Sequence, residues 1–152
     1  MRTLLALLAP AVAAVLLAAQ PASAVPSVKW GPYQTPGGKA KVHGTYIAVG
    51  EDHDVLPTAD TLTVKGKLTD YARSPGTCAW VMWQFAIRKG NQFVIKEKNL
   101  RDCSYGTAKK FTLVYKDVYQ AELKVCSEAK AAAPSASCRY SGTWKIIYKS
   151  PL

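Results

Sequence analysis

Residues 78–103 read CAWVMWQFAIRKGNQFVIKEKNLRDC, which is two strand-like runs joined by a short polar turn, with a cysteine at each end. Gly90 and Asn91 tolerate the positive φ angles of a two-residue hairpin turn, so they are predicted to form its loop. Counting outward from this turn places Cys78 opposite Cys103. Directly opposed Cβ atoms lie roughly 4.5 to 5.5 Å apart, close enough for a disulfide after modest adjustment. The turn and the cysteines therefore predict the same antiparallel register.

The first strand of this hairpin is apolar on both faces, which is typical of a central or doubly covered strand. One face presents Ala79, Val81, Trp83, Phe85 and Ile87, and the other presents Trp80, Met82 and Ala86. In the predicted register, Lys96 and Lys98 of the second strand fall on the first of these faces. Either these lysines lie at a sheet edge and cover the rings with their stems, or a bulge turns the strand over.

The N-terminal segment 1–24 has the order of a secretory signal peptide, with Arg2, a long Leu/Ala/Val run and Ala-Ser-Ala before the expected cleavage after Ala24. A retained membrane anchor is the alternative. Cleavage leaves 128 residues, enough for one domain with its own core and no transmembrane segment. Residues 25–39 are rich in Pro, Gly and aromatic residues and are expected to form an irregular arm, with room for a short edge strand and with its aromatic residues packed on the body, before a single domain over 40–152.

All four cysteines follow the predicted cleavage site, and an even number behind a signal peptide indicates disulfides. Four cysteines allow three connectivities, of which we favour the sequence-adjacent pairs, Cys78 with Cys103 and Cys126 with Cys138. Zinc binding is the competing use of four cysteines, but no CxxC spacing occurs in the sequence. We therefore expect two disulfides and no free thiol.

Further strand candidates, most with period-two alternation, cover residues 40–49, 60–72, 108–115, 119–126 and 139–148. The segment 127–137 is small and polar and is expected to contain at most a helical turn before Pro134. With the hairpin, these runs make seven strands and no long amphipathic helix. They predict an all-β fold, an antiparallel two-sheet sandwich of immunoglobulin-like type, with a small β-barrel as the alternative.

The charge is strongly positive: 20 Lys and Arg against 10 Asp and Glu give +10. Four acids, Glu51, Asp52, Asp54 and Asp60, fall in one short segment, so the rest of the surface is more basic than the total indicates. Such a surface attracts polyanions, and an anionic cell-wall polymer or an acidic protein is the expected partner of a secreted monomer. Nucleic acid is a less suitable partner for an exported protein. Solubility and protection of strand edges by lysine explain the same charge without a partner.

Catalytic motifs are absent from the sequence: there is no Gly-x-Ser-x-Gly, His-Glu-x-x-His or phosphate loop, and the only histidines are His43 and His53. We expect no catalytic residues, no cofactor and a non-enzymatic protein. The nearest approach to a metal site is a set of weak oxygen and imidazole candidates, Glu51, Asp52, His53, Asp54 and Asp60. They lack the spacing of a calcium loop, so a solvated acidic loop is the preferred interpretation.

Aromatic and basic residues of the hairpin suggest a second kind of site. The predicted ligand or partner patch consists of Trp80, Met82, Arg88, Phe93, Ile95 and Arg101. Trp80 and Met82 point away from the main core in the predicted strand, so they would suit a flat partner or an amphiphilic ligand. The alternative is that Trp30 or Tyr33 of the arm covers them.

The run Cys78-Ala79-Trp80-Val81, the seven-strand pattern, the two hairpin-like disulfides and the Ala-rich leader resemble the small secreted actinobacterial apoproteins that carry enediyne chromophores. The resemblance implies a β-sandwich that carries a small molecule in an apolar pocket between its sheets. Those carriers are acidic, whereas this chain is basic. The leading hypothesis from the residues is a cationic, non-catalytic binding module, and the others are a small-molecule carrier and a hydrolase inhibitor that presents residues 127–137.

Overall fold

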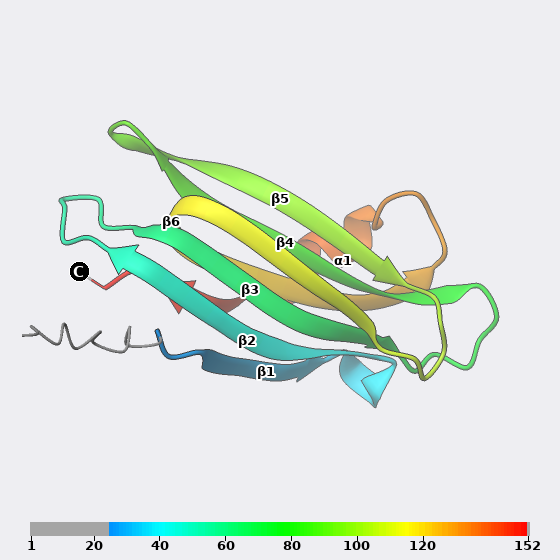
Figure 1. Cartoon of the computed structure of the whole chain (residues 1–152). Helices are drawn as coiled ribbons and strands as arrows, with labels where there is room; N and C mark the ends of the chain where they lie inside the picture. The colour runs from blue at the N-terminus through cyan, green and yellow to red at the C-terminus, as the bar shows by residue number, and fades with distance from the viewer. Residues whose placement is uncertain (1–24, 152) are drawn as a thin grey trace, which may run out of the picture.

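The computed structural model describes residues 25–151, so the predicted signal peptide 1–24 lies outside the described residues. These residues form seven strands: β1 (Val28–Gln34), β2 (Ala40–Glu51), β3 (Ala59–Asp70), β4 (Thr77–Lys89), β5 (Gln92–Asp102), β6 (Lys109–Ala129) and β7 (Lys145–Lys149). A 3-10 turn, η1 (Pro36–Gly38), and a short helix, α1 (Ala136–Tyr140), complete this part of the chain (Figure 1). The all-β prediction is confirmed. No helix within residues 25–151 is long and apolar enough to cross a membrane.

The strands form one open antiparallel sheet in the order β1-β2-β3-β6-β4-β5, and β7 also pairs with β6. The 21-residue strand β6 joins the two halves, because its first half pairs with β3 and its second half pairs with β4. The sequence predicted two strands here, 108–115 and 119–126, and that division is wrong. β6 continues through the junction as one strand, although Asp117 has a positive φ of 54° and the pairing with β4 shifts register just after it, between Val118 and Gln120.

The two halves of the sheet face each other across an aromatic core. The Trp30 ring of β1 meets the Trp83 ring of β4 edge-on, with their centroids 5.4 Å apart. Phe111 of β6 lies 5.9 Å from Trp83, and Phe85 stacks on Tyr115 at 4.1 Å. The sheet therefore folds over on itself, whereas its separation into two sheets stays a prediction.

A pair of glycines makes room for Trp30 in this core. Gly44 of β2 lies opposite Gly66 of β3, and the same row continues to Trp30 on one side and to Phe111 on the other. A Cβ atom at Gly44 would lie 2.7 Å from the Trp30 ring, and one at Gly66 would lie 2.9 Å from it. The ring can lie across both strands only because neither has a side chain here. The segment expected as an irregular arm is thus mainly the edge strand β1, with Trp30 buried.

The register predicted for the hairpin is confirmed. β4 and β5 pair without a shift from Ala79 opposite Asp102 to Lys89 opposite Gln92, and both predicted disulfides, Cys78–Cys103 and Cys126–Cys138, are formed. No described cysteine is free.

The lysines that conflicted with the apolar face of β4 are explained by the position of β5 at the edge of the sheet. Lys98 lies opposite Trp83, yet Trp83 is fully buried and Lys98 is exposed. Because the pairing has no irregularity, the alternative of a bulge in this hairpin is wrong.

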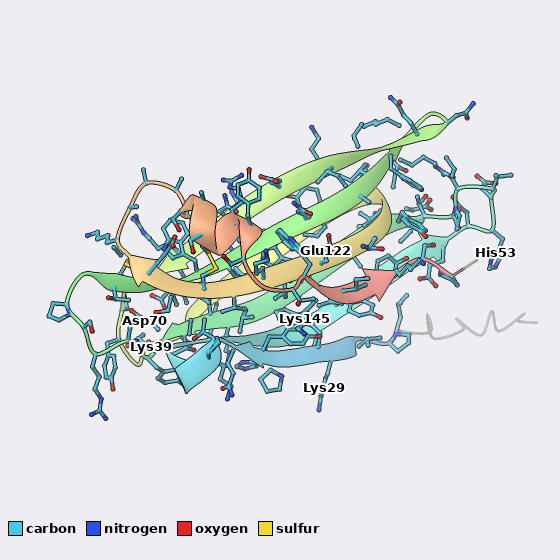
Figure 2. All side chains as sticks on the ribbon, turned by 180° about the vertical axis from the view of Figure 1, so that it is seen from behind. Lys29, Lys39, His53, Asp70, Glu122 and Lys145 are labelled. Carbon is cyan, nitrogen blue, oxygen red and sulfur yellow. A yellow bond between two sulfur atoms is a disulfide. The ribbon has the colours of Figure 1, made fainter. Side chains whose placement is uncertain are left out.

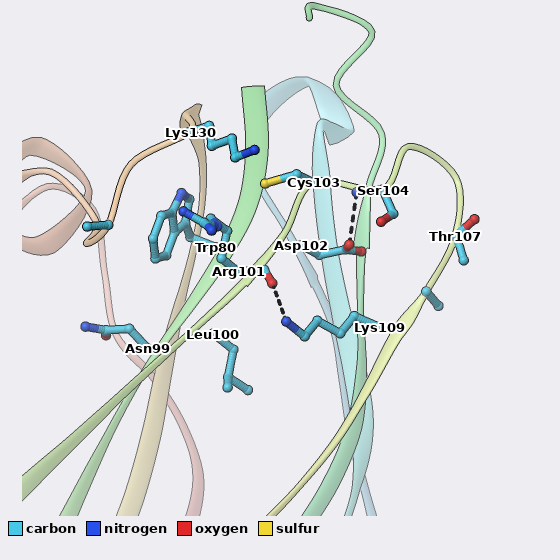
Figure 3. A pocket seen from close by; sticks show the side chains of 12 residues that line it. Trp80, Asn99, Leu100, Arg101, Asp102, Cys103, Ser104, Thr107, Lys109 and Lys130 are labelled. Atoms are coloured by element: carbon cyan, nitrogen blue, oxygen red, sulfur yellow. Dashed lines mark hydrogen bonds between the residues drawn. The ribbon is translucent and has the colours of Figure 1, made fainter. Parts of the chain in front are cut away.

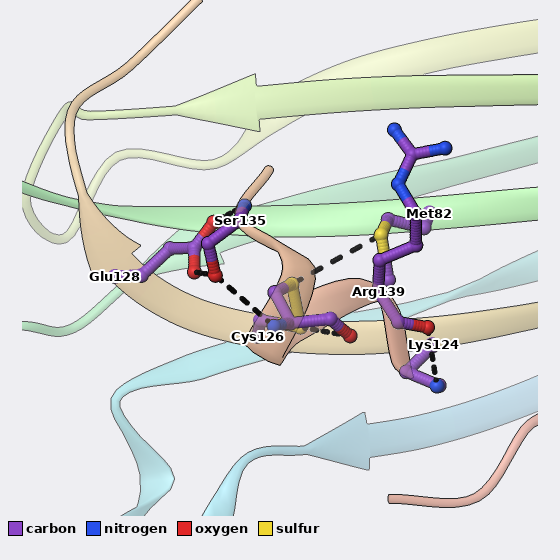
Figure 4. The surroundings of a disulfide bond; sticks show 7 residues. Met82, Lys124, Cys126, Glu128, Ser135 and Arg139 are labelled. Carbon is purple, nitrogen blue, oxygen red and sulfur yellow. Dashed lines mark hydrogen bonds between the residues drawn. A yellow bond between two sulfur atoms is a disulfide. The ribbon is translucent and has the colours of Figure 1, made fainter. Parts of the chain in front are cut away.

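The predicted last strand, 139–148, is wrong in its first half. Residues 136–140 form α1, and β7 begins only at Lys145. Ser135 caps the helix, because its Oγ accepts a hydrogen bond of 3.1 Å from the Cys138 backbone N–H. Glu128 in turn accepts from the Ser135 N–H at 2.7 Å, and the disulfide ties Cys138 to β6 (Figure 4). A cap and a covalent tie thus outweigh the β-like pattern of this segment.

Candidate functional site

The predicted aromatic patch on β4 is not an exposed surface. Trp80 is 3% exposed and Met82 is 2% exposed, because α1 and its disulfide cover this face of the strand. The Met82 sulfur lies 4.0 Å from the Cys138 sulfur (Figure 4). The two residues are therefore covered, as the alternative held, but the cover is the C-terminal segment rather than Trp30 or Tyr33 of the arm, which lie against the main core.

The other four residues of the predicted patch are dispersed. The Arg101 guanidinium lies 5.5 Å from the centre of the Trp80 ring, and Phe93 stacks on Tyr119 at 4.7 Å. Ile95 is 56% exposed. Arg88 points to the loop between β2 and β3 and forms ion pairs there. These side chains share a hairpin in the sequence without forming one binding surface.

A hollow of about 700 Å³ lies beside the outer edge of β5, near Trp80, Arg101 and Asp102 (Figure 3). Lys109 crosses it and donates a 2.8 Å hydrogen bond to the Arg101 carbonyl. Arg101 itself donates to the Ala131 carbonyl. These contacts engage one carbonyl of the β5 edge and the Arg101 guanidinium, and a lysine over an edge strand disfavours pairing with another chain.

Several acidic residues of the predicted weak metal site accept hydrogen bonds from other groups of the protein. Asp52 accepts from the Thr58 backbone N–H at 2.8 Å and from the Arg88 guanidinium at 2.8 Å, and these contacts hold the pKa of Asp52 below its usual range. Asp54 also accepts from Arg88, at 3.0 Å, and Glu51 accepts from the Tyr148 hydroxyl at 2.9 Å. Within residues 25–151, no group of three His, Cys, Asp or Glu side chains is placed to hold a metal.

A different set of residues gathers on the outer face of the β1-β2-β3-β6 half of the sheet. We call this surface the cationic face and define it as Lys29, Lys41, His43, Lys65, Lys67 and Lys110. Strand alternation places these side chains opposite the core-facing residues, and Figure 2 shows Lys29 projecting outward from β1. Thr45 and Thr112 complete one cross-strand row, because Lys29, Thr45, Lys65 and Thr112 are successive pairing partners.

The cationic face contains a shallow depression of about 470 Å³. It is lined by residues of four strands, and most of its exposed lining surface is apolar: Lys29, His43, Gly44, Thr45, Lys65, Gly66, Lys67, Lys110, Phe111 and Thr112. Gly44 and Gly66, which pair with each other, also line the depression. Side chains at these two positions would point into the core, so only their backbone faces the depression. No acidic residue lines the depression among the described residues.

The positive charge of this face is not neutralised from within the described part of the molecule. The three ion pairs of residues 25–151 use Arg88 and Arg139, and none uses a lysine. Lys67 and Lys110 lie directly opposite each other on adjacent strands, which is an unfavourable like-charge pair. A face that concentrates cations in this way can attract a multiply charged anion, and its hydroxyl groups can donate hydrogen bonds to the anion's oxygens.

The sequence predicts part of this site. Alternation along β3 places Lys65 and Lys67 on one face, and alternation along β2 places Lys41 and His43 on one face. It does not show that these two faces adjoin, or that Lys110 of β6 lies beside Lys67. The cationic face needs the strand order β1-β2-β3-β6, which places the distant β6 next to β3.

Comparisons with known proteins find no counterpart of this chain. No family model, no curated protein and no solved structure matches the chain. The functional argument is therefore made from the residues of the site.

Proposed function

We propose that this chain is a non-catalytic binding protein that holds an anionic polymer on its cationic face. The observation that supports this most directly is the depression between Lys29, Lys65, Lys67 and Lys110, which no acidic residue of the described chain lines. Lysine ammonium groups act as strongly hydrated point charges, so they suit flexible, multiply charged ligands better than one rigid anion.

The shape of the site favours an extended ligand. The depression is shallow and open, and its cations continue along the strands rather than surrounding one point. Lys65 and Lys67 are two residues apart on one face of β3, which separates their Cα atoms by about 6.6 Å. A polymer with a regularly repeated phosphate or carboxylate can contact several of these lysines at once, and such multiple contacts strengthen weak binding.

Export forms part of the proposal. The two disulfides use all four cysteines of the chain, and disulfides persist mainly in oxidising compartments. We also infer that the two facing halves of the sheet act as the layers of the immunoglobulin-like sandwich expected from the sequence, with the cationic face as the outer surface of one layer. An anionic polymer of the cell envelope is then the expected ligand.

We do not extend the proposal to carriage of a small molecule. The space between the two halves of the sheet, where a carrier would need its pocket, is occupied by Trp30, Trp83, Phe85 and Phe111. Trp83 and Phe85 have no exposed surface. A ligand could enter there only by displacing core side chains.

The proposal is tested by charge reversal on the face with a matched control elsewhere. Lys65→Glu/Lys67→Glu changes the depression, whereas Lys96→Glu/Lys98→Glu makes the same charge change at exposed positions of β5. Binding to immobilised long-chain polyphosphate should weaken at least about 30-fold in the first variant, because each lost lysine contact contributes about 1 kcal/mol at low salt. The control should lose much less.

Two results would contradict the proposal. Equal losses in both variants would mean that net charge alone attracts the polymer and that no defined face exists. Wild-type binding that stays unchanged from 50 mM to 500 mM salt would exclude an electrostatic site, because the screening length for exposed charges falls from roughly 14 Å to roughly 4 Å over this range.

A further inference from the structure

His43 of β2 is the residue of the depression whose charge can change near neutral pH. It lines the depression together with lysines of β1, β3 and β6, and its side chain is exposed to solvent. An imidazole gains or loses its proton between about pH 5 and pH 8, whereas a lysine stays charged throughout this range. The number of positive charges at the depression therefore depends on one side chain.

His43 stands at the end of a row of cations that crosses three strands. It pairs with Lys67 of β3, and Lys67 pairs with Lys110 of β6. Side chains that lie directly opposite each other on adjacent antiparallel strands have their Cβ atoms roughly 5 Å apart, and like charges in such pairs repel. A proton on His43 makes this row three consecutive positive charges, so the protein without a ligand resists that proton.

The strands around His43 present only cations to it. On β1, the register shift between Trp30 and Tyr33 leaves the uncharged Gly31 and Pro32 beside it. None of the three ion pairs of residues 25–151 uses His43, and no acidic residue of the described chain lines the depression. The charged residues that share its face on the four strands are Lys29 of β1, Lys41 of β2, Lys65 and Lys67 of β3, and Lys110 of β6.

We propose that the depression is a proton-coupled anion site, which binds its ligand most tightly when His43 is protonated. The inference rests on the proposed function, because it concerns the regulation of the same site. An anion held by Lys67 and Lys110 offsets the repulsion that a proton on His43 meets in the free protein, so a bound anion favours uptake of that proton. By linkage, the proton favours the anion by the same factor.

Hydrogen bonding acts in the same direction as charge. A neutral imidazole donates from one ring nitrogen and accepts at the other, whereas the protonated ring donates from both. The oxygens of a phosphate or carboxylate are acceptors, so the protonated ring of His43 suits them better than the neutral ring. Affinity should therefore rise as the pH falls through the range in which imidazoles titrate, and fall again toward pH 8.

The test compares binding of long-chain polyphosphate at about pH 8 and about pH 5.5, at constant ionic strength. The inner phosphates of this probe keep their charge over the range, so a change in affinity reports on the protein. Wild type should bind at least about fivefold more tightly at the lower pH, which corresponds to about 1 kcal/mol, the contribution of one basic residue near an anionic surface.

Three variants assign the effect to one residue. His43→Gln keeps a polar side chain but cannot take up a proton, so its affinity should be nearly the same at both pH values. His43→Lys fixes the positive charge and should bind at the higher pH about as tightly as wild type binds at the lower pH. His53→Gln is the matched control and should keep the wild-type ratio, because His53 lies in the loop between β2 and β3, at one end of the molecule and apart from Lys29 (Figure 2).

Calorimetry gives a second readout that a merely structural role of His43 would not change. Titrations near neutral pH in two buffers of different ionisation enthalpy should show net proton uptake on binding in wild type and none in His43→Gln. The inference is overturned if His43→Gln keeps the wild-type ratio of affinities, or if wild type binds equally at both pH values while Lys65→Glu/Lys67→Glu still weakens binding. If Lys65→Glu/Lys67→Glu binds as well as wild type at both pH values, the proposed function itself is overturned, and this inference with it.

Discussion

Replacing Gly44 by alanine should strongly destabilise the protein, although alanine normally favours folding over glycine. Gly44 has no positive φ, so alanine could adopt its backbone conformation and would restrict the unfolded chain, a gain of about 0.4 to 1 kcal/mol. The new Cβ, however, would lie 2.7 Å from the Gly66 Cα and 2.7 Å from the Trp30 ring, and nearer still to the Lys65 carbonyl oxygen. Two of these three obstacles are backbone atoms, which cannot rotate away.

The magnitude follows from the distances. Real Cβ atoms essentially never approach other heavy atoms closer than 3.0 Å, so β2 and β3 must separate or Trp30 must leave its place. Overpacking of a core typically costs 1 to 3 kcal/mol, and a backbone obstacle places this substitution at the upper end, near 3 kcal/mol. With a urea m-value of about 1.5 kcal/mol/M, the unfolding midpoint should fall by about 2 M.

The assay is urea unfolding of the oxidised protein, with Gly37→Ala as the control. Gly37 has a φ of 74° and no atom within 4 Å of an added Cβ, so alanine there meets only the left-handed strain of about 1 to 2 kcal/mol. If Gly44→Ala were as stable as wild type or more stable, Trp30 would not depend on the glycine pair, and the packing argument would be refuted.

Two further predictions concern stability. The pKa of Asp52 is lower in the folded state than in the unfolded chain, mainly because the Thr58 N–H and then Arg88 stabilise its charged form. Its stabilisation is therefore fully present above the unfolded-state pKa of about 3.9 and is lost as the pH falls through the folded-state pKa; Asp52→Asn should have a lower urea midpoint than wild type at pH 7, and this difference should shrink progressively as the pH is lowered below 4. Cys126→Ala/Cys138→Ala should lose about 3 kcal/mol of stability and shift tryptophan emission to longer wavelength, because the segment over Trp80 is no longer tied to β6; an unchanged spectrum would mean that packing alone holds α1 in place.

The sequence predicted best those features that depend on local pattern. The turn at Gly90 and Asn91, the hairpin register and the Cys78–Cys103 disulfide all follow from residues close together in the chain. The strand expected at 139–148 failed for a local reason too, because the Ser135 cap was not weighed against the alternating apolar residues that follow it.

Features that depend on strand order could not be predicted in the same way. The apolar second face of β4 correctly indicated a covering layer, but the cover is α1, which contacts Met82 across 56 positions of sequence. The ion pair between Arg88 and Asp52 joins β4 to the loop between β2 and β3 over 36 positions, and the residues around either one do not predict this contact. The cationic face likewise brings β2, β3 and β6 together only through the sheet topology.

The acidic residues make their hydrogen bonds away from the cationic face. Within residues 25–151, most carboxylates already have hydrogen-bond donors: Glu51, Asp52, Asp54, Asp70, Glu97, Asp102, Glu122 and Glu128. The donors are backbone amides, three hydroxyls, two side-chain amides and two arginines, and none is a lysine of the face. The face thus keeps its repulsion in the isolated protein, and an anionic ligand that relieves it should stabilise the fold in proportion to its binding.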